Sequence, residues 1–341
     1  FSKTDSVIRP EIPANSPIDW NNMVDDYRMT QNQESRTAIS KLMSYLGTAV
    51  TMSYSKDGSG ASDNSIAPAL KHYFNYDART IQRENYPLDK YEEVLYNELK
   101  AGRPIILCGH STGGGHCFVI DGHDGNGLFH VNWGWGGDSN GYFKVSILNP
   151  NNMSGIGASS SPDGYAMSQT ATLGIEPNTD NIATPDQLQT YMMDAWDDSI
   201  AISAWNYTGV THSWDIALAI QQADGELKLV SDIYSEDNVG NYYGWQWLTF
   251  KLTNIPMEAG VYNVMAVNRV KGTQAWLCEP YDVAQVTRGE DGSMKVSYES
   301  IASPSGITVD NISCTGTHFN KQWQTVKFRV NNRKALDKYT N

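Results

Sequence analysis

The sequence predicts an α+β domain followed by an all-β sandwich. Amphipathic helical patterns occupy the early part of the chain, and short strand patterns follow them. After a polar, proline-bearing stretch at residues 176–185, only strand patterns remain. The chain has 341 residues, which is enough for two or three domains.

Three helices are expected in the first domain. Residues 31–46 carry apolar side chains at helical spacing, and Gly47 can cap the helix C-terminus. A second helix is expected over 64–74, with Asn64 as its N-cap, and a third over about 88–101. Strands are then expected at 104–108, 116–121, 128–133 and 142–147.

The part after the linker is read as an immunoglobulin-like sandwich, because short strands are separated by turn residues. The strand at 260–269 shows the clean alternation of a half-buried strand. The other strands are expected at 199–206, 214–220, 227–234, 245–252 and 274–278. Residues 301–341 hold further strands, which complete the sandwich or start another domain.

One predicted hairpin carries the candidate chemistry. The strand patterns at 116–121 and 127–132 flank a turn, and a three-residue loop at 123–125 would place His116 directly opposite Asn132. Side chains that oppose each other in this way lie about 4.5–5.5 Å apart at Cβ and share a face. The amide of Asn132 could then orient the imidazole, as cysteine proteases require.

The residues around this histidine strengthen the catalytic interpretation. Three glycines, 113–115, precede His116 and would let a substrate backbone approach closely. Trp133 could shield the histidine–asparagine pair from water. A lone histidine is usually structural, but the opposed Asn132, the glycines and the tryptophan-rich run at 133–137 together favour catalysis.

Residues 15–177 resemble the streptopain family of bacterial cysteine proteases, which have a papain-like fold. The segments that carry the resemblance are 18–23, 38–43, 58–61, 69–70, 115–122, 130–137 and 148–150. The resemblance implies that His116 is the general base, that Asn132 orients it and that Trp133 covers the pair. It also implies a substrate cleft lined by Ser59, Gly60, Gly114, Gly115 and Trp135.

The domains expected on this basis are a C-terminal portion of a papain-like protease domain at 1–177, a linker at 178–187 and an immunoglobulin-like sandwich at 188–300. The expected function is a secreted bacterial cysteine endopeptidase that acts on polypeptide substrates.

The nucleophilic cysteine of that family is missing from its expected place. In the family it precedes the Asp-Trp-Asn-Asn element, which here begins at Asp19. The four cysteines, Cys108, Cys117, Cys278 and Cys314, are all downstream, and they do not form a disulfide framework. The nucleophile is therefore expected upstream of Phe1, in a Cys-bearing segment or propeptide of the same processed precursor, so this chain alone should be inactive.

The composition limits which binding partners and which cellular location are expected for the protein. The formal net charge of −13 argues against nucleic acid and anionic membrane surfaces, and no apolar stretch is long enough to span a membrane. The richness in Tyr, Trp, Asn, Ser and Gly suits a secreted or cell-surface bacterial protein. No cofactor or metal is expected, because metal-ligand spacing is absent among the histidines and in the acidic group Asp194, Asp197 and Asp198.

Three alternatives stay open. The chain could be a non-catalytic relative whose sandwich binds a surface or polymer. It could be a serine hydrolase that uses Ser111 within the Gly-x-Ser-x-Gly match at 109–113, although that fold needs a parallel sheet and a later triad, and here a hairpin follows instead. His130 could be the base instead of His116, but its expected opposite partner, Phe118, cannot orient it.

Overall fold

The computed structural model describes residues 11–29, 32–55, 58–150, 164–179, 182 and 184–300, and the backbone of 307–315 and 325–332. The chain divides into two compact units, Phe1–Tyr298 and Glu299–Asn341. In the second unit, β16 (Ile307–Thr315) and β17 (Thr325–Asn332) pair with each other in antiparallel fashion.

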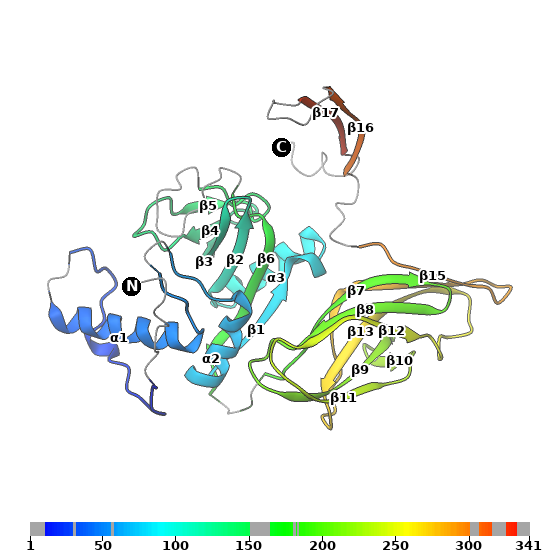
Figure 1. Cartoon of the computed structure of the whole chain (residues 1–341), viewed down its shortest axis with the longest axis horizontal. Coiled ribbons are helices and arrows are strands. Elements are labelled where there is room, and N and C mark those ends of the chain that lie inside the picture. Colours follow the sequence, from blue (N-terminus) through cyan, green and yellow to red (C-terminus); the bar gives the residue numbers. More distant parts are fainter. Residues whose placement is uncertain are drawn as a thin grey trace. The chain divides into compact units, whose positions relative to one another are not determined.

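The first unit begins with three helices and a six-stranded antiparallel sheet (Figure 1). The helices are α1 (Gln33–Ala49), α2 (Ile66–Phe74) and α3 (Leu88–Lys100), with the short 3-10 helices η1 (Trp20–Asn22), η2 (Asp63–Ser65) and η3 (Arg83–Asn85). The strand order is β1-β6-β2-β3-β4-β5. The strands are β1 (Tyr76–Gln82), β2 (Ile105–Ser111), β3 (Gly114–His123), β4 (Phe129–Asn132), β5 (Gly141–Phe143) and β6 (Met167–Pro177).

The three helices lie where they were predicted, but two caps differ. Helix α1 starts at an N-cap, Asn32, whose side chain accepts from the backbone N–H of Glu34. Gly47 does not end it, since the helix continues to Ala49 and the Tyr54 hydroxyl occupies the space of a Gly47 side chain. Helix α2 follows the η2 turn, so its N-cap is Ser65 rather than Asn64.

The core of this part lies between α3 and one face of the sheet. Tyr91 and Leu95 of α3 are fully buried, and they belong to the same apolar cluster as residues of β2, β3, β4 and β6. The strand residues of the cluster include Ile105, Leu107, Phe118, Ile120, Phe129, Val131, Ala171 and Leu173. Alternate residues of β2 and β3 therefore face the core, and the intervening residues face the other side of the sheet.

Two further antiparallel sheets complete the first unit. One has the order β10-β9-β13-β14-β15, with β11 also paired to β9, and the other has the order β12-β8-β7. Their strands are β7 (Gln189–Trp196), β8 (Ser199–Trp205), β9 (His212–Gln221), β10 (Leu227–Leu229), β11 (Tyr234–Val239), β12 (Gly244–Lys251), β13 (Gly260–Val270), β14 (Leu277–Arg288) and β15 (Met294–Ser297). Ile202 of β8, Ile216 of β9 and Val264 of β13 share one buried cluster, so the two sheets enclose a common core.

Direct contacts join the helical part to these two sheets. Lys71 of α2 forms an ion pair with Asp186 at 2.5 Å, and the other carboxylate oxygen of Asp186 lies 2.8 Å from His212 Nε2 in β9. Tyr86 donates its hydroxyl to Glu279 of β14 at 3.0 Å. The segment 178–187, which was expected to be a linker, thus supplies Asp186 to a partly buried charge network.

Within the described part of the chain, no helix has the combination of length and apolar character that a membrane crossing needs.

Candidate active site

The β3–β4 hairpin exists, but its register differs from the predicted one. The ladder pairs His123 with Phe129 and, after a bulge at Asp121, Val119 with Asn132. The loop is longer than expected because the Asp124 carboxylate accepts from the N–H groups of Asn126 and Leu128, at 2.7 and 2.9 Å. The main-chain N–H of Asp124 also donates to the Leu128 carbonyl. The prediction that His116 opposes Asn132 is therefore wrong.

Asn132 lies on the opposite face of the sheet from His116. Directly paired residues share a face, and Val119, the partner of Asn132, is three residues from His116 on a strand without an intervening bulge. The side chain of Asn132 is exposed and its oxygen accepts from the N–H of Gly134 at 3.0 Å. It fixes the tryptophan-rich turn and does not contact the imidazole.

His116 finds a different partner, the main chain of Trp133. Its Nε2 lies 2.8 Å from the Trp133 carbonyl oxygen. The imidazole also lies nearly parallel to the Trp135 ring, with centroids 5.0 Å apart, and to the Trp133 ring at 6.4 Å. Burial lowers the pKa of His116 below its usual value, and the hydrogen bond to the Trp133 carbonyl opposes that shift. The ring is therefore held in a fixed plane and favours its neutral form.

The packing of aromatic rings around His116 requires a glycine in the neighbouring strand. Gly109 of β2 is the residue directly opposite His116, and a Cβ atom there would overlap the carbonyl of Tyr165. The Tyr165 ring is fully buried and contacts the imidazole, with centroids 5.6 Å apart. Gly109 thus allows Tyr165 to close the aromatic enclosure around His116.

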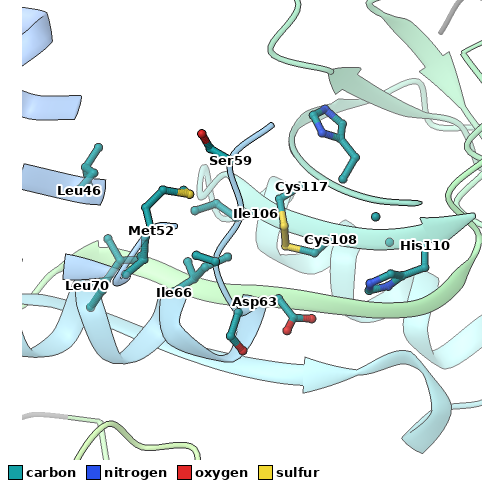
Figure 2. A pocket seen from close by; sticks show the side chains of 18 of the residues that line it. Leu46, Met52, Ser59, Asp63, Ile66, Leu70, Ile106, Cys108, His110 and Cys117 are labelled. Carbon is teal, nitrogen blue, oxygen red and sulfur yellow. A yellow bond between two sulfur atoms is a disulfide. The ribbon is translucent and has the colours of Figure 1, made fainter. Parts of the chain in front are cut away.

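A cavity of about 650 Å³ lies beside this histidine. Its apolar wall comes from α1, α2 and β2 and includes Leu46, Ile66, Leu70 and Ile106 (Figure 2). Such a volume is typical of ligand and substrate sites. The complete lining is Leu46, Val50, Met52, Ser59, Gly60, Ala61, Ser62, Asp63, Ile66, Ala69, Leu70, Phe74, Ile106, Cys108, Gly109, His110, Gly115, His116 and Cys117.

The structure brings together only some of the residues predicted to form the cleft. Ser59, Gly60 and Gly115 line the cavity together with His116. Gly114 and Trp135 are not part of its lining, and Trp135 instead stacks on the imidazole. The glycine at 115 has a local role, since a side chain there would collide with the ring of His110.

Two cysteines of the cavity wall form a disulfide that was not predicted. Cys108 of β2 and Cys117 of β3 are directly paired across the two strands and are bonded through their sulfur atoms. The third cysteine, Cys278, lies in β14 among the sandwich strands, and burial raises the pKa of its thiol to about 11. Among the cysteines whose side chains the structure describes, none presents a thiol to His116. Cys314 belongs to the second unit, and its side chain is outside the described part.

The structure bears on two alternatives raised by the sequence, Ser111 as the nucleophile and His130 as the base. Ser111 is buried in the β2–β3 turn, where its hydroxyl donates to the Gly114 carbonyl at 2.9 Å and accepts from the N–H of Gly113. It therefore serves the turn, which weighs against a serine nucleophile. His130 was expected to face Phe118, but it pairs with Gly122 and its Nδ1 lies 2.5 Å from the Asp121 carboxylate. His130 does have an orienting partner, although it does not line the cavity.

The comparisons with known proteins agree with the cysteine protease interpretation. Residues 2–143 match the model of the Peptidase C10 family. The chain is 36% identical over 160 residues to streptopain of Streptococcus pyogenes, a match that covers 46% of this chain and 39% of streptopain. It is 33% identical over 211 residues to the thiol protease/hemagglutinin PrtT of Porphyromonas gingivalis, covering 59% of this chain and 24% of that protein.

A solved structure gives a similar match. The structure of active wild-type interpain A cysteine protease of Prevotella intermedia is 36% identical in sequence, with a TM-score of 0.42, over 47% of this chain and 65% of that one. The chain thus spans well under half the length of the curated relatives that it matches.

Proposed function

Because residues 2–143 match the model of the Peptidase C10 family, we propose that this chain supplies the general base of a secreted bacterial cysteine endopeptidase. His116 would take the proton of a cysteine thiol and later return it to the leaving amine of the cleaved peptide. The observation that carries the proposal is the hydrogen bond between His116 Nε2 and the Trp133 carbonyl.

This hydrogen bond selects the useful tautomer of the imidazole. A carbonyl oxygen can only accept, so Nε2 of the neutral ring must carry the proton. The lone pair is then on Nδ1, where it can accept a proton from a thiol. The Trp133 carbonyl would thus perform the orienting role that was first expected of Asn132. A thiolate next to the ring would favour the imidazolium and so form the reactive ion pair.

The thiol itself is proposed to come from a Cys-bearing segment upstream of Phe1 in the same precursor. Support comes from the described cysteines, of which two are disulfide-bonded and the third, Cys278, is half-buried in β14. The apolar cavity beside His116 offers a surface against which such a segment could pack. Backbone donors of that segment, including the N–H of the nucleophile, would hold the oxyanion.

Secretion and the type of β-sandwich are parts of the same proposal. The Cys108–Cys117 disulfide supports secretion, since disulfides persist in oxidising compartments. Two antiparallel sheets that share one core support an immunoglobulin-like arrangement for residues 188–300.

A second candidate function, adhesion to a polymer, is favoured by one observation on the sandwich. The indole rings of Trp196 and Trp247 lie nearly parallel with centroids 6.3 Å apart, and the two residues are 38% and 54% exposed. Exposed aromatic rings are enriched at binding surfaces. This function would not need His116.

The test is reconstitution of the proposed enzyme. The chain is co-expressed with the segment that precedes it in its precursor, and peptide hydrolysis is measured with and without a thiol-directed epoxide inhibitor. We expect turnover that the inhibitor abolishes, and no turnover from this chain alone. Turnover by this chain alone, or turnover that resists the inhibitor, would show that the proposed thiol mechanism is wrong. Polymer binding that survives His116→Ala while no peptide is ever cleaved would favour the second candidate.

A further inference from the structure

We propose that the Cys108–Cys117 disulfide is an exchange site for low-molecular-weight thiols, and that an adduct on Cys117 obstructs the cavity beside His116. Both cysteines line that cavity, and Figure 2 shows their disulfide next to Ile106 and His110 on the strand side of the space. The exchange itself does not depend on the proposed peptidase function. Only its consequence for substrate binding does.

The two sulfur-bearing residues differ sharply in access. Cys108 is only 3% exposed, whereas Cys117 is an exposed residue. An attacking thiolate must approach along the S–S axis, so access largely decides which sulfur is attacked. Gly115, two residues before Cys117 on the same face of β3, adds no side chain of its own beside it. The attack is therefore directed to Cys117.

The reaction balances without a further oxidant or reductant. The sulfur of a small thiolate bonds to the Cys117 sulfur, the Cys108–Cys117 bond breaks, and Cys108 leaves as a thiolate that takes up a proton. A second small thiol can attack the adduct and release it as a disulfide, which leaves two protein thiols. His110 lies two residues from Cys108 on the same face of β2, and its ring lies over Gly115 at the edge of the same cavity.

The adduct would fill space that is open in the disulfide form. Cys117 is on the cavity wall together with Ser59, Gly60 and Gly115. A tripeptide thiol attached there would occupy much of a space of about 650 Å³. The cavity would then accept neither an apolar probe nor a peptide side chain.

The first experiment locates the adduct. The Cys278→Ser, Cys314→Ser variant, which retains only the disulfide cysteines, is treated briefly with reduced glutathione, and free thiols are blocked with N-ethylmaleimide. Peptide mass spectrometry should find glutathione on Cys117 and the maleimide on Cys108, with at least about a tenfold preference over the reverse pattern. The same treatment in urea, where both sulfurs are accessible, should abolish the preference. Equal labelling in the folded protein, labelling mainly on Cys108, or no reaction under conditions that label the unfolded chain would overturn the proposal.

The second experiment measures the cavity. Binding of the apolar dye anilinonaphthalene sulfonate is compared between the disulfide form and the purified glutathione adduct, and we expect several-fold weaker binding to the adduct. The Cys108→Ser, Cys117→Ser variant exposed to glutathione is the control, and its dye binding should not change. Equal dye binding by adduct and disulfide forms would contradict obstruction. Neither experiment requires turnover, so their failure is distinguishable from failure of the proposed peptidase function.

Discussion

The imidazole of His116 and the main-chain carbonyl of Trp133 form a hydrogen bond of 2.8 Å. Because the acceptor is a backbone atom, no side-chain substitution at position 133 removes it outright. The carbonyl is instead positioned by the turn that follows β4, in which the Trp133 N–H donates to Asn140 and the Gly134 N–H donates to Asn132. Orientation of the proposed base is therefore a property of the turn.

The first prediction separates the three candidate site residues in the reconstituted enzyme. His116→Ala should lower kcat/KM by about 10²–10⁴-fold, the usual effect of removing a general base. Asn132→Ala should lower it only a few-fold, since that side chain contacts Gly134 and not the imidazole. His130→Ala should also be mild, because His130 does not line the cavity.

The measurement is kcat/KM on one peptide substrate, with circular dichroism as the control for folding. A severe loss for Asn132→Ala together with a mild one for His116→Ala would contradict this assignment.

The second prediction concerns Gly109, which lies opposite His116. Gly109→Ala would push a methyl group into the carbonyl of Tyr165, which is backbone and cannot swing away. Overpacking of this kind typically costs about 1–3 kcal/mol in the free energy of unfolding. Gly141→Ala, in β5 of the same sheet, is the matched control, because its new methyl would meet only Phe143 at 3.7 Å.

Urea denaturation of both variants checks this prediction. If the two variants have the same free energy of unfolding, the Tyr165 carbonyl does not exclude a side chain at position 109, and the prediction is wrong.

Local patterns were enough to predict much of the fold but not the strands with unusual composition. The helices and strands such as β2 and β13 follow the periodicity of their apolar residues. The central strand β6 was missed because it buries Gln169, Thr170 and Thr172, polar residues typical of a surface. Gln169 can be buried because its amide donates to the Val145 carbonyl, a contact that no local pattern reveals.

The candidate site was predicted only in part, because its geometry also depends on contacts that local sequence patterns do not reveal. Turn residues 122–126 correctly indicated a hairpin, but the register depends on the loop length, which the Asp124 carboxylate sets through two hydrogen bonds. A shift of register changes every partner. The disulfide, by contrast, could have been predicted from the sequence. A two-residue turn at 112–113 pairs Ser111 with Gly114 and, counted outward, Cys108 with Cys117.

The third prediction is that the cysteines of this chain are dispensable for chemistry. Replacing Cys108, Cys117, Cys278 and Cys314 by serine should leave kcat of the reconstituted enzyme largely unchanged at a temperature where it is folded. Loss of the disulfide should cost roughly 2–3 kcal/mol of stability by the loop-entropy estimate for a short loop. The measurements are kcat and urea denaturation of the same preparation. Abolished turnover in a folded variant would place the nucleophile within this chain.

The last prediction concerns Asp282 of β14, which is 6% exposed. Its carboxylate accepts from the N–H of Met192 at 2.6 Å and from the hydroxyl of Tyr298 at 3.0 Å. Burial nevertheless outweighs these bonds and raises the pKa of Asp282 from 3.8 to about 6. Between these values the unfolded chain has lost the proton and the folded chain retains it, so this group's contribution to stability falls as pH rises.

The difference between the wild-type chain and Asp282→Asn isolates that contribution. The free energy of unfolding of the wild type should fall relative to the variant by up to about 3 kcal/mol between pH 4 and pH 6, and the difference should be constant above that range. Urea denaturation at a series of pH values measures it. Asp224→Asn, in an exposed turn, is the control for the change of charge alone. If the wild-type and Asp282→Asn curves run parallel from pH 4 to pH 7, the Asp282 carboxyl does not retain its proton in the folded chain.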